Sequence, residues 1–306
     1  MGVFFTPGCN ILMYHRVTNP GNDPQLLSVS PKNFEEQVVF LKKHRRLLTV
    51  DEFDEILNSK KTLPAKSVLI TLDDGYADNY QEALPILERH EIQALFFIST
   101  AHIDTLREFW WDDLERIFLE NSEIPKKLSF NLGGNHYDIT TETRFDITKA
   151  YRQFHKIIKP LDTEKREELL NLLCVWANLP RDGRLSCKSM TRKEIRQLSL
   201  SSSVIIGAHS HNHVSLSALS AEMQRKEIVL SKKILEDITE KPVKHFSYPF
   251  GSHSDYTRES IAICKELNFT SAFSGFPGIA SKTSERFELP RIIVRNWNAK
   301  ELAEHI

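Results

Sequence analysis

The sequence predicts an α/β fold in which six or seven βα units form a closed or nearly closed barrel. Short, β-rich apolar runs alternate with amphipathic stretches along most of the 306-residue chain, which is the rhythm of a mainly parallel sheet or barrel. Several of these runs are continuously apolar, as in strands that are covered on both faces. The number of units favours a barrel over an open sheet.

The elements can be followed from the N-terminal end. NILMY (10–14) predicts a first strand, and SPKNFEEQVVFLKKH (30–44) predicts a helix with a serine cap and a proline at its first position. A second short helix should begin at Thr49, because Glu52 lies at the spacing of a capping box. SVLITL (67–72) has the composition of a fully buried strand.

A break in the alternation of predicted strands and helices indicates an insertion. A helix around 79–90, interrupted by a proline, and the strand ALFFI (94–98) come first. From about 103 to 190 the sequence then predicts a mainly helical segment, with a hairpin around Gly133 and Gly134. We therefore treat residues 1–306 as a single domain that carries this insertion.

The alternation resumes after the insertion. The expected elements are a helix capped by Thr191 and Glu194, the strand SSVIIGA, a helix at about 220–239, the strand VKHFSYPF, a helix near 255–267, and strands near SAFSG and RIIV.

Charge and composition exclude several classes of partner. Lys and Arg total 40 and Asp and Glu total 41, so the net charge is -1. No basic field favours nucleic acid or an anionic membrane, and no apolar run is long enough to span a bilayer. The first 15 residues have no basic segment typical of an export signal, and the four cysteines lack metal-type spacing. These features predict a cytoplasmic protein with reduced, buried thiols.

Paired aspartates follow one of the buried strands. Asp73 and Asp74 come directly after SVLITL, and Gly75 allows a sharp backbone turn. In barrels of this kind, reactive residues collect at the carboxyl ends of strands. Two adjacent carboxylates are costly there unless a cation or a shared proton relieves them. The alternative is that both aspartates cap the next helix.

A histidine cluster follows another strand. HSHNH places His209 at the end of VIIGA, with His213 four residues further on. Two imidazoles and one carboxylate make a three-ligand set that leaves room for water, as in catalytic zinc sites. We therefore expect His209, His213 and one of the two aspartates to bind a metal and His211 to be a solvated loop residue.

Three motifs carry a resemblance to a known family. TLDDG (71–75), HSHNH (209–213) and YPFG (248–251), in this order, resemble the polysaccharide deacetylases of the NodB-homology type. The segments ILMYHRV, ALPILERHEIQALFFIST and ELPRIIV also look like that family. The resemblance covers roughly 1–100 and 190–297.

The resemblance implies a fold and a set of roles. The fold is a distorted, TIM-like barrel of about seven strands. Asp73 would be the general base, and Asp74, His209 and His213 would bind Zn²⁺ or another divalent ion such as Co²⁺, Ni²⁺ or Fe²⁺. The reaction would remove N-acetyl groups from an amino sugar of an N-acetylglucosamine-type glycan or glycan precursor. The backbone N–H of Phe250 would help to hold the oxyanion.

The sequence departs from the commoner family pattern at the general acid. Arg291 stands in ELPRIIV where many members have a histidine, and Ser247 precedes Pro249 where an arginine is often found. We expect His15, in MYHRV, to supply the proton, although a histidine that only bonds the backbone is the alternative. Arg291 is expected to orient Asp73.

Two other functions are compatible with the ligand set. A 2-His-1-carboxylate site can hold iron for oxygen chemistry, although paired aspartates and the absence of all-β patterning oppose that interpretation. A carbohydrate-binding module that has lost catalysis is the second alternative. Retention of Asp73 opposes it, because a binding module does not need a base. Trp110 and Trp111 are expected to anchor the insertion rather than to contact sugar.

Overall fold

The computed structural model describes residues 7–19, 21–59 and 61–306. The chain divides into two compact units. The first ends at Asp104 and resumes at Ser189, and the second comprises residues 105–188. The second unit coincides with the insertion that the sequence predicts at about 103–190.

The first unit contains a parallel sheet, which within the described residues has eight strands in the order β11-β10-β9-β6-β5-β1-β12, with β4 beside β5. Short strands β2 and β3 pair with each other outside it. The bounds are β1 Cys9–Tyr14, β2 Arg16–Val17, β3 Ser28–Val29, β4 Arg46–Leu47, β5 Ser67–Leu72, β6 Ala94–Ile98, β9 Val204–Ala208, β10 His245–Ser247, β11 Ser271–Phe273 and β12 Ile292–Ile293.

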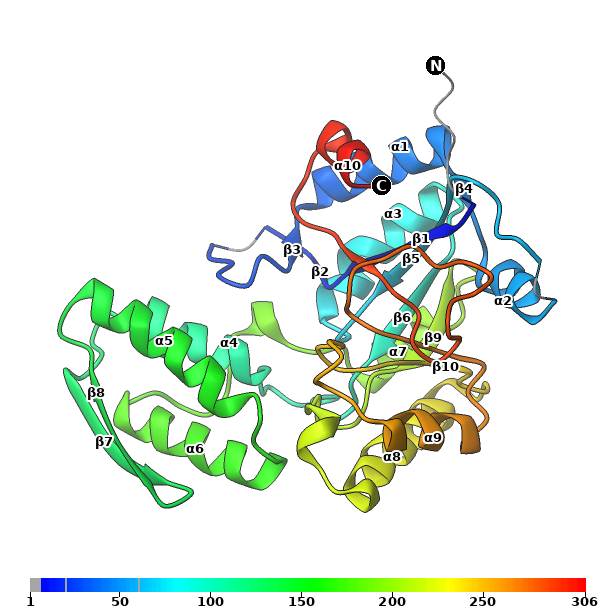
Figure 1. The fold of residues 1–306 in the computed structure, drawn as a ribbon. Helices are drawn as coiled ribbons and strands as arrows, with labels where there is room; N and C mark the ends of the chain where they lie inside the picture. The colour runs from blue at the N-terminus through cyan, green and yellow to red at the C-terminus, as the bar shows by residue number, and fades with distance from the viewer. Residues whose placement is uncertain (1–6, 20, 60) are drawn as a thin grey trace. The chain divides into compact units, whose positions relative to one another are not determined.

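The sheet curls into a half-barrel (Figure 1). Its two edges approach each other through Leu289, three residues before β12, which forms a parallel bridge with Phe273 of β11. The α/β fold of the distorted barrel type is therefore confirmed.

Both faces of the sheet are buried, as the apolar runs predict. Leu12, Ile70 and Phe96 belong to the larger hydrophobic core, which they share with the apolar faces of the surrounding helices. Their neighbours along the strands, such as Ile11 and Leu69, belong to a second core. Because successive side chains of a strand point to opposite faces, this alternation holds each strand between two cores.

The helices of the first unit begin where their caps predict. Ser30 accepts a hydrogen bond from the N–H of Asn33 at the start of α1, and Thr49 and Thr191 form capping boxes with Glu52 and Glu194. The bounds are α1 Pro31–His44, α2 Val50–Asn58, α3 Leu84–Arg89, α7 Arg192–Leu198, α8 Ala221–Thr239, α9 Arg258–Glu266 and α10 Ala299–His305.

One helix differs from its sequence prediction. The helix expected around 79–90 starts as a π-helical segment, η1 (Asn79–Ala83), and becomes α-helical only in α3. The chain is helical without a break from residue 77 to residue 89, and Pro85 follows directly after the π-helical segment. The proline therefore lies where the helix changes type, and the helix continues past it.

The second unit is mainly helical with one hairpin. Gly133 and Gly134 have φ values of 58° and 81°, and they connect the hairpin strands as expected. Trp110 and Trp111 are buried and pack against each other edge to face. The bounds are α4 Trp110–Glu115, η2 Arg116–Glu120, β7 Lys127–Leu132, β8 Asn135–Thr140, α5 Arg144–Ile158 and α6 Thr163–Trp176.

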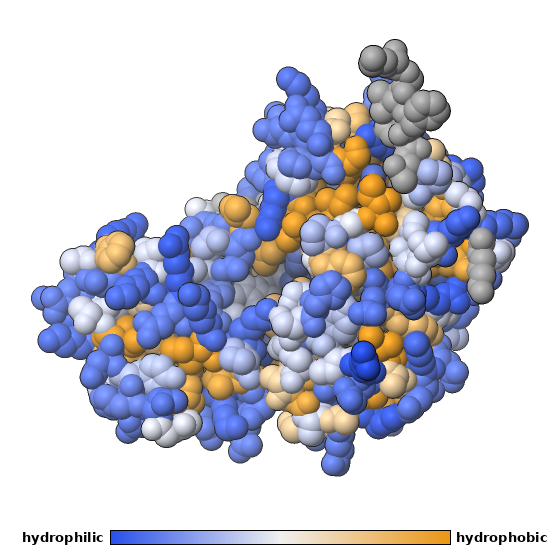
Figure 2. Space-filling view, in the orientation of Figure 1, coloured by the Kyte–Doolittle hydropathy of each residue, from blue (hydrophilic) through white to orange (hydrophobic). Residues whose placement is uncertain are grey.

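The surface in Figure 2 carries mostly polar residues, with apolar residues in separate patches. Among the described residues, no helix combines the length and the apolar character needed to cross a membrane. The cysteines are unpaired and buried, as expected. Residues 1–6, on which part of the N-terminal prediction depends, lie outside the described residues.

Candidate metal centre and active site

The predicted site residues of the first unit meet at the carboxyl edge of the parallel sheet. Asp73 and Asp74 directly follow β5, and His209 directly follows β9. These strands flank β6, so their ends lie two strand positions apart on one edge. His15 follows β1, the next strand beyond β5. The sheet topology thus brings together residues as far apart in the chain as His15 and His209, which are separated by 194 positions.

The backbone at this edge adopts conformations that few residues other than glycine tolerate. Asp74, Ser210, His213 and Phe250 have φ values of 74°, 59°, 49° and 60°. Non-glycine residues with positive φ are uncommon, and such strain clusters at functional sites. Gly75 continues the turn after Asp74 with a φ of 88°, and a Cβ atom there would lie 2.8 Å from the Ile98 side chain. These turns aim the polar side chains of two loops at one place.

Asp74, His209 and His213 form a compact set of metal-binding groups. Asp74 Oδ1 lies 3.4 Å from His209 Nε2 and 3.2 Å from His213 Nε2. The three ligand atoms lie within 4.8 Å of one another, and all three residues are buried. Ligands at about 2.0–2.2 Å from a tetrahedral zinc ion are separated by about 3.3–3.6 Å. The separations from Asp74 are close to that geometry.

The orientation of His209 is fixed by the backbone of β10. Its Nδ1 lies 2.8 Å from the carbonyl oxygen of Ser247, to which it donates as an N–H group. This contact places a proton on Nδ1, so Nε2, which faces Asp74, is the nitrogen that can bind a cation when the ring is neutral. A histidine held in this way is prepared to bind a cation.

The charge state of Asp74 also suits a metal ligand. Burial alone would raise the pKa of this carboxyl group, but its interactions with His209 and His213 outweigh burial and hold the pKa well below its usual range. Asp74 Oδ1 nevertheless accepts no hydrogen bond of standard geometry. A cation at this point would satisfy a buried carboxylate oxygen, so the residues present fit a divalent ion.

Asp73 lies beside this set but is held by a different partner. Its Oδ1 and Oδ2 accept hydrogen bonds of 2.7 and 2.6 Å from the two terminal nitrogens of Arg291. Ser247 Oγ accepts from Arg291 at 2.8 Å and donates to Asp73 Oδ2 at 3.2 Å. Asp73 Oδ2 lies 3.8 Å from His209 Nε2, at the border of the ligand set. The second carboxylate is thus oriented without being a ligand in this geometry.

The ion pair determines the charge of Asp73. Burial would raise the pKa of this carboxyl group, but the charge and hydrogen bonds of Arg291, together with the charges of His209 and His15, outweigh burial and lower the pKa. A bidentate guanidinium fixes both the ionised form and the plane of the carboxylate. Asp73 is therefore a preoriented anion at neutral pH.

Arg291 does not lie at the carboxyl end of a strand, and its long side chain extends to Asp73. It lies one residue before β12, and its side chain passes close to the Phe97 ring, with the guanidinium carbon 5.5 Å from the ring centroid. Its Nε donates to the carbonyl of Ser274 at 2.7 Å. Although Arg291 precedes its strand, the length of its side chain brings the guanidinium to the active edge. This arrangement supports the orienting role that the sequence suggested.

His15 lies in the electrostatic field of the same site. Burial lowers the pKa of its imidazole, while the charges of Asp74 and Asp73 act in the opposite direction. Its Nδ1 is buried and makes no hydrogen bond with the described residues.

Phe250 contacts the metal-binding set through its ring. The ring lies edge to face with His213, with centroids 4.8 Å apart. The next residue, Gly251, donates its N–H to the carbonyl of Pro249 at 2.7 Å and has a φ of 68°. This tight turn positions the YPFG loop over the site.

Two other histidines have structural partners. His211 lies in a loop and is half-buried, so its side chain is partly solvated, and its Nδ1 lies 2.8 Å from Thr100 Oγ1. The loop of His211 packs on the segment after β6, where the N–H groups of Thr100 and Ala101 donate to the carbonyl of His211. His245 is buried between Ser271 and Asp54, and burial lowers its pKa to about 3. Neither belongs to the ligand set.

Sequence reasoning gave Ser247 no role beyond marking a missing arginine. In the structure its carbonyl orients His209 and its hydroxyl joins Asp73 to Arg291. A serine has no distinctive spacing or charge, so its position two residues before Pro249 was the only available signal.

Comparisons with known proteins place the sequence beside polysaccharide deacetylases. The family model for polysaccharide deacetylase matches residues 60–171 and 181–271. YxkH of Bacillus subtilis (strain 168), which carries the same family name, is 24% identical over 285 residues, covering 93% of this chain and 70% of that protein. A poly-beta-1,6-N-acetyl-D-glucosamine N-deacetylase of Staphylococcus aureus (strain MSSA476) is 40% identical over 77 residues, a quarter of each chain.

Solved structures share the fold. The deacetylase PplD of Streptococcus pyogenes superposes with a TM-score of 0.62 at 19% identity, covering 98% of this chain and 99% of that one. IcaB of Ammonifex degensii superposes with a TM-score of 0.64 at 16% identity, covering 98% and 97%. With a family model that matches about two thirds of its residues, and with paired aspartates and histidines at the strand ends, this chain belongs to the polysaccharide deacetylase family.

Proposed function

We propose that this protein is a divalent-metal-dependent hydrolase that removes N-acetyl groups from an amino sugar of a polysaccharide or glycan precursor. The proposal rests on one observation: the two aspartates have different partners. Asp74 faces two imidazoles, whereas Asp73 is held by Arg291 beside them. A metal-binding module alone would need only the first arrangement.

The ion would be held by Asp74, His209 and His213. When bound, it would act as a Lewis acid on the acetamide carbonyl and lower the pKa of water at the site. Three protein ligands leave a coordination position open for such chemistry.

Asp73 is proposed as the general base. Its ionised carboxylate can accept the proton that water loses when it attacks the acetamide carbon. Arg291 and Ser247 hold the carboxylate in one plane, so little reorganisation is needed at the moment of proton transfer. The pairing with Arg291 also keeps Asp73 available as an anion at neutral pH.

Two further groups complete the proposal. The backbone N–H of Phe250 is assigned to the oxyanion, because its ring packs on His213 and its loop is fixed by a tight turn. The departing amine needs a proton when the C–N bond breaks, and His15 is assigned to donate it. Acetate and a free amino sugar are the products.

Acetate release from β-1,6-linked N-acetylglucosamine oligosaccharides tests the proposal. The name of the S. aureus relative suggests this probe. We expect metal-supplemented wild type to release acetate and Asp73→Asn to be about 10²- to 10⁴-fold slower, the usual contribution of a general base. Asp237→Asn, an exposed aspartate of α8, is the matched control and should behave as wild type.

The same assay separates the competing functions. Oligosaccharide binding by wild type without acetate release would favour a binding module. Equal rates in wild type and Asp73→Asn would remove the assigned base. Consumption of oxygen that depends on added iron would favour the iron enzyme.

A further inference from the structure

A stacked pair of rings beside the site has no part in the proposed chemistry. His253 and Phe276 lie with their centroids 4.2 Å apart and their planes within 20° of parallel. The His253 side chain is exposed, and Phe276 is half-buried beneath it. The pair therefore presents an aromatic surface to solvent.

This stack is joined to the proposed catalytic loop by backbone contacts. Gly275, which precedes Phe276, donates its N–H to the carbonyl of Gly251 at 2.8 Å. A Cβ atom on Gly251 would lie only 2.2 Å from that nitrogen, so the two loops approach as closely as the backbone allows. The carbonyl of Phe276 accepts from the N–H of Arg291 at 3.1 Å. The stack thus borders both Phe250 and the residue that holds Asp73.

The turn that carries His253 is held at both ends. Asp255 is buried, its N–H donates to the carbonyl of Ser252 at 2.9 Å, and its carboxylate accepts from the N–H of Ser252 at 3.1 Å. The carbonyl of Asp255 accepts from the N–H of Ser217 at 3.1 Å. A turn fixed in this way loses little conformational entropy when a ligand binds to it.

A stacked aromatic pair is not a binding site by itself. Trp297 and His305 form a similar stack on the same unit, with centroids 4.0 Å apart, a half-buried indole and an exposed imidazole. That pair belongs to α10 and the segment before it, and no hydrogen bond joins it to Phe250 or Gly251 among the described residues. Continuity with the catalytic loop distinguishes the first pair from the second.

We propose that His253 and Phe276 form a sugar-stacking subsite, on which a sugar ring next to the deacetylated residue lays its apolar C–H face. This inference rests on the proposed function, because it assigns the substrate an extended chain rather than a single sugar. Aromatic rings suit this task because they offer large contact area with few rotatable bonds.

Binding of a β-1,6-linked N-acetylglucosamine pentasaccharide, measured by calorimetry, tests the subsite. The measurement uses the 306-residue chain with Asp73→Asn, so that turnover does not consume the ligand. We expect an additional His253→Ala substitution to weaken binding about 3- to 10-fold, the range that aromatic contacts usually contribute. His253→Phe, which keeps a flat ring, should restore binding, and His305→Ala should leave it unchanged.

Chain length provides a second readout. His253→Ala in otherwise wild-type protein should reduce acetate release from the pentasaccharide more than from the monosaccharide, through a higher KM. His253 is exposed, so its removal needs no repacking, and Phe276→Leu tests the lower ring while retaining apolar volume.

Several results would overturn the subsite. These are absence of pentasaccharide binding by the Asp73→Asn protein, equal affinities with and without His253→Ala, or equal loss with His305→Ala. Acetate release by wild type is recorded in parallel and reports on the proposed function separately. Release without dependence on His253 would reject the subsite and leave the function standing.

Discussion

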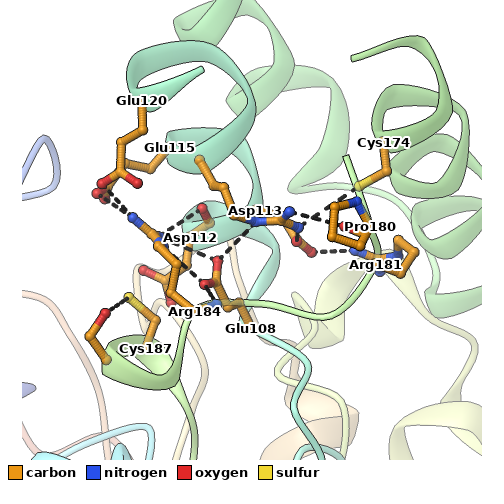
Figure 3. A network of polar contacts seen from close by, with 12 residues as sticks. Glu108, Asp112, Asp113, Glu115, Glu120, Cys174, Pro180, Arg181, Arg184 and Cys187 are labelled. Carbon is orange, nitrogen blue, oxygen red and sulfur yellow. Dashed lines mark hydrogen bonds and ion pairs between the residues drawn. The ribbon is translucent and has the colours of Figure 1, made fainter. Parts of the chain in front are cut away.

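Two clusters of buried charge in this molecule differ in how their carboxylates are balanced. In the first unit, Asp74 faces two imidazoles, and its Oδ1 accepts no hydrogen bond of standard geometry. In the second unit, buried carboxylates are paired with guanidinium groups (Figure 3). Asp113 binds Arg116 at 2.7 Å and Arg181 at 2.5 Å, and Glu108 binds Arg184 at 2.9 Å.

The difference separates a binding site from a structural network. Charge-assisted bonds to arginine neutralise a buried carboxylate and satisfy its lone pairs, so no cation is required. Imidazoles can be neutral, and they do not then balance the charge of the carboxylate. Their lone pairs and the carboxylate can instead bind one cation together. Backbone strain agrees with this distinction, because positive φ values occur at Asp74, Ser210 and His213 in the first cluster. Buried charge alone would not have identified the site.

The largest expected effect on stability comes from breaking the network in the second unit. Asp113→Ala removes the carboxylate that Arg116 and Arg181 share, although each keeps a second carboxylate partner, and it should lower the free energy of unfolding by about 2–3 kcal/mol. Urea denaturation measures the change. Asp182→Ala, at an exposed position of the same unit, is the control. An unchanged midpoint for Asp113→Ala would show that the network contributes nothing to stability.

A smaller effect, on activity, is expected from Ser247→Ala in the first cluster. Its hydroxyl joins Asp73 to Arg291, whereas its carbonyl, which orients His209, remains after the substitution. Acetate release should fall about 10- to 100-fold while metal content is retained. Ser274→Ala is a matched control, since Ser274 is equally buried but its hydroxyl donates to the carbonyl of Leu289. Equal losses in both variants would indicate general disruption.

The smallest expected effect is on the pH dependence of stability, through Glu115 in the second cluster. Burial raises the pKa of Glu115 to about 7; Arg184 lowers it and Glu120 adds to the increase. The folded state then binds this proton more tightly than the unfolded state does. Its contribution is present below the unfolded pKa, near 4.5, and is lost as the pH rises through 7.

Replacing Glu115 should therefore flatten the pH dependence of stability. We expect Glu115→Gln to reduce the loss between pH 5 and pH 8 by about 1 kcal/mol, because this side chain is partly solvated. Thermal unfolding at both pH values measures this loss of stability. Glu123→Gln, at an exposed position, is the control. A steeper dependence in Glu115→Gln would contradict the direction of the pKa shift.

Much of the fold could be predicted because its signals are local. The serine cap and Pro31 mark the start of α1. The continuous, β-rich apolar run SVLITL predicts a strand that is buried on both faces. The π-helical start at Asn79–Ala83 could not be predicted, since it depends on tertiary packing rather than on propensity. The ion pairs of the second unit join residues as far apart as Glu108 and Arg184, so no periodicity indicates them.

The sequence allowed us to predict which residues form the candidate site, but not which contacts they make. Carboxylates and imidazoles after buried strands indicate which residues meet, because parallel strands end at one edge. Arg291 precedes its strand, so the strand-end rule did not place it, and its orienting role was a hypothesis made where the sequence departs from the family pattern. The hydrogen bond between His211 and Thr100 depends on how one loop packs on the end of β6, which no sequence pattern encodes.

Metal content is the most direct test of the account. Elemental analysis after dialysis against zinc should give about one ion per chain for wild type and for Asp73→Asn, and almost none for Asp74→Asn. Glu115→Gln, in the arginine-paired network, should bind as wild type does. Full occupancy in Asp74→Asn, or loss of the ion in Glu115→Gln, would contradict the assignment of the cation to Asp74, His209 and His213.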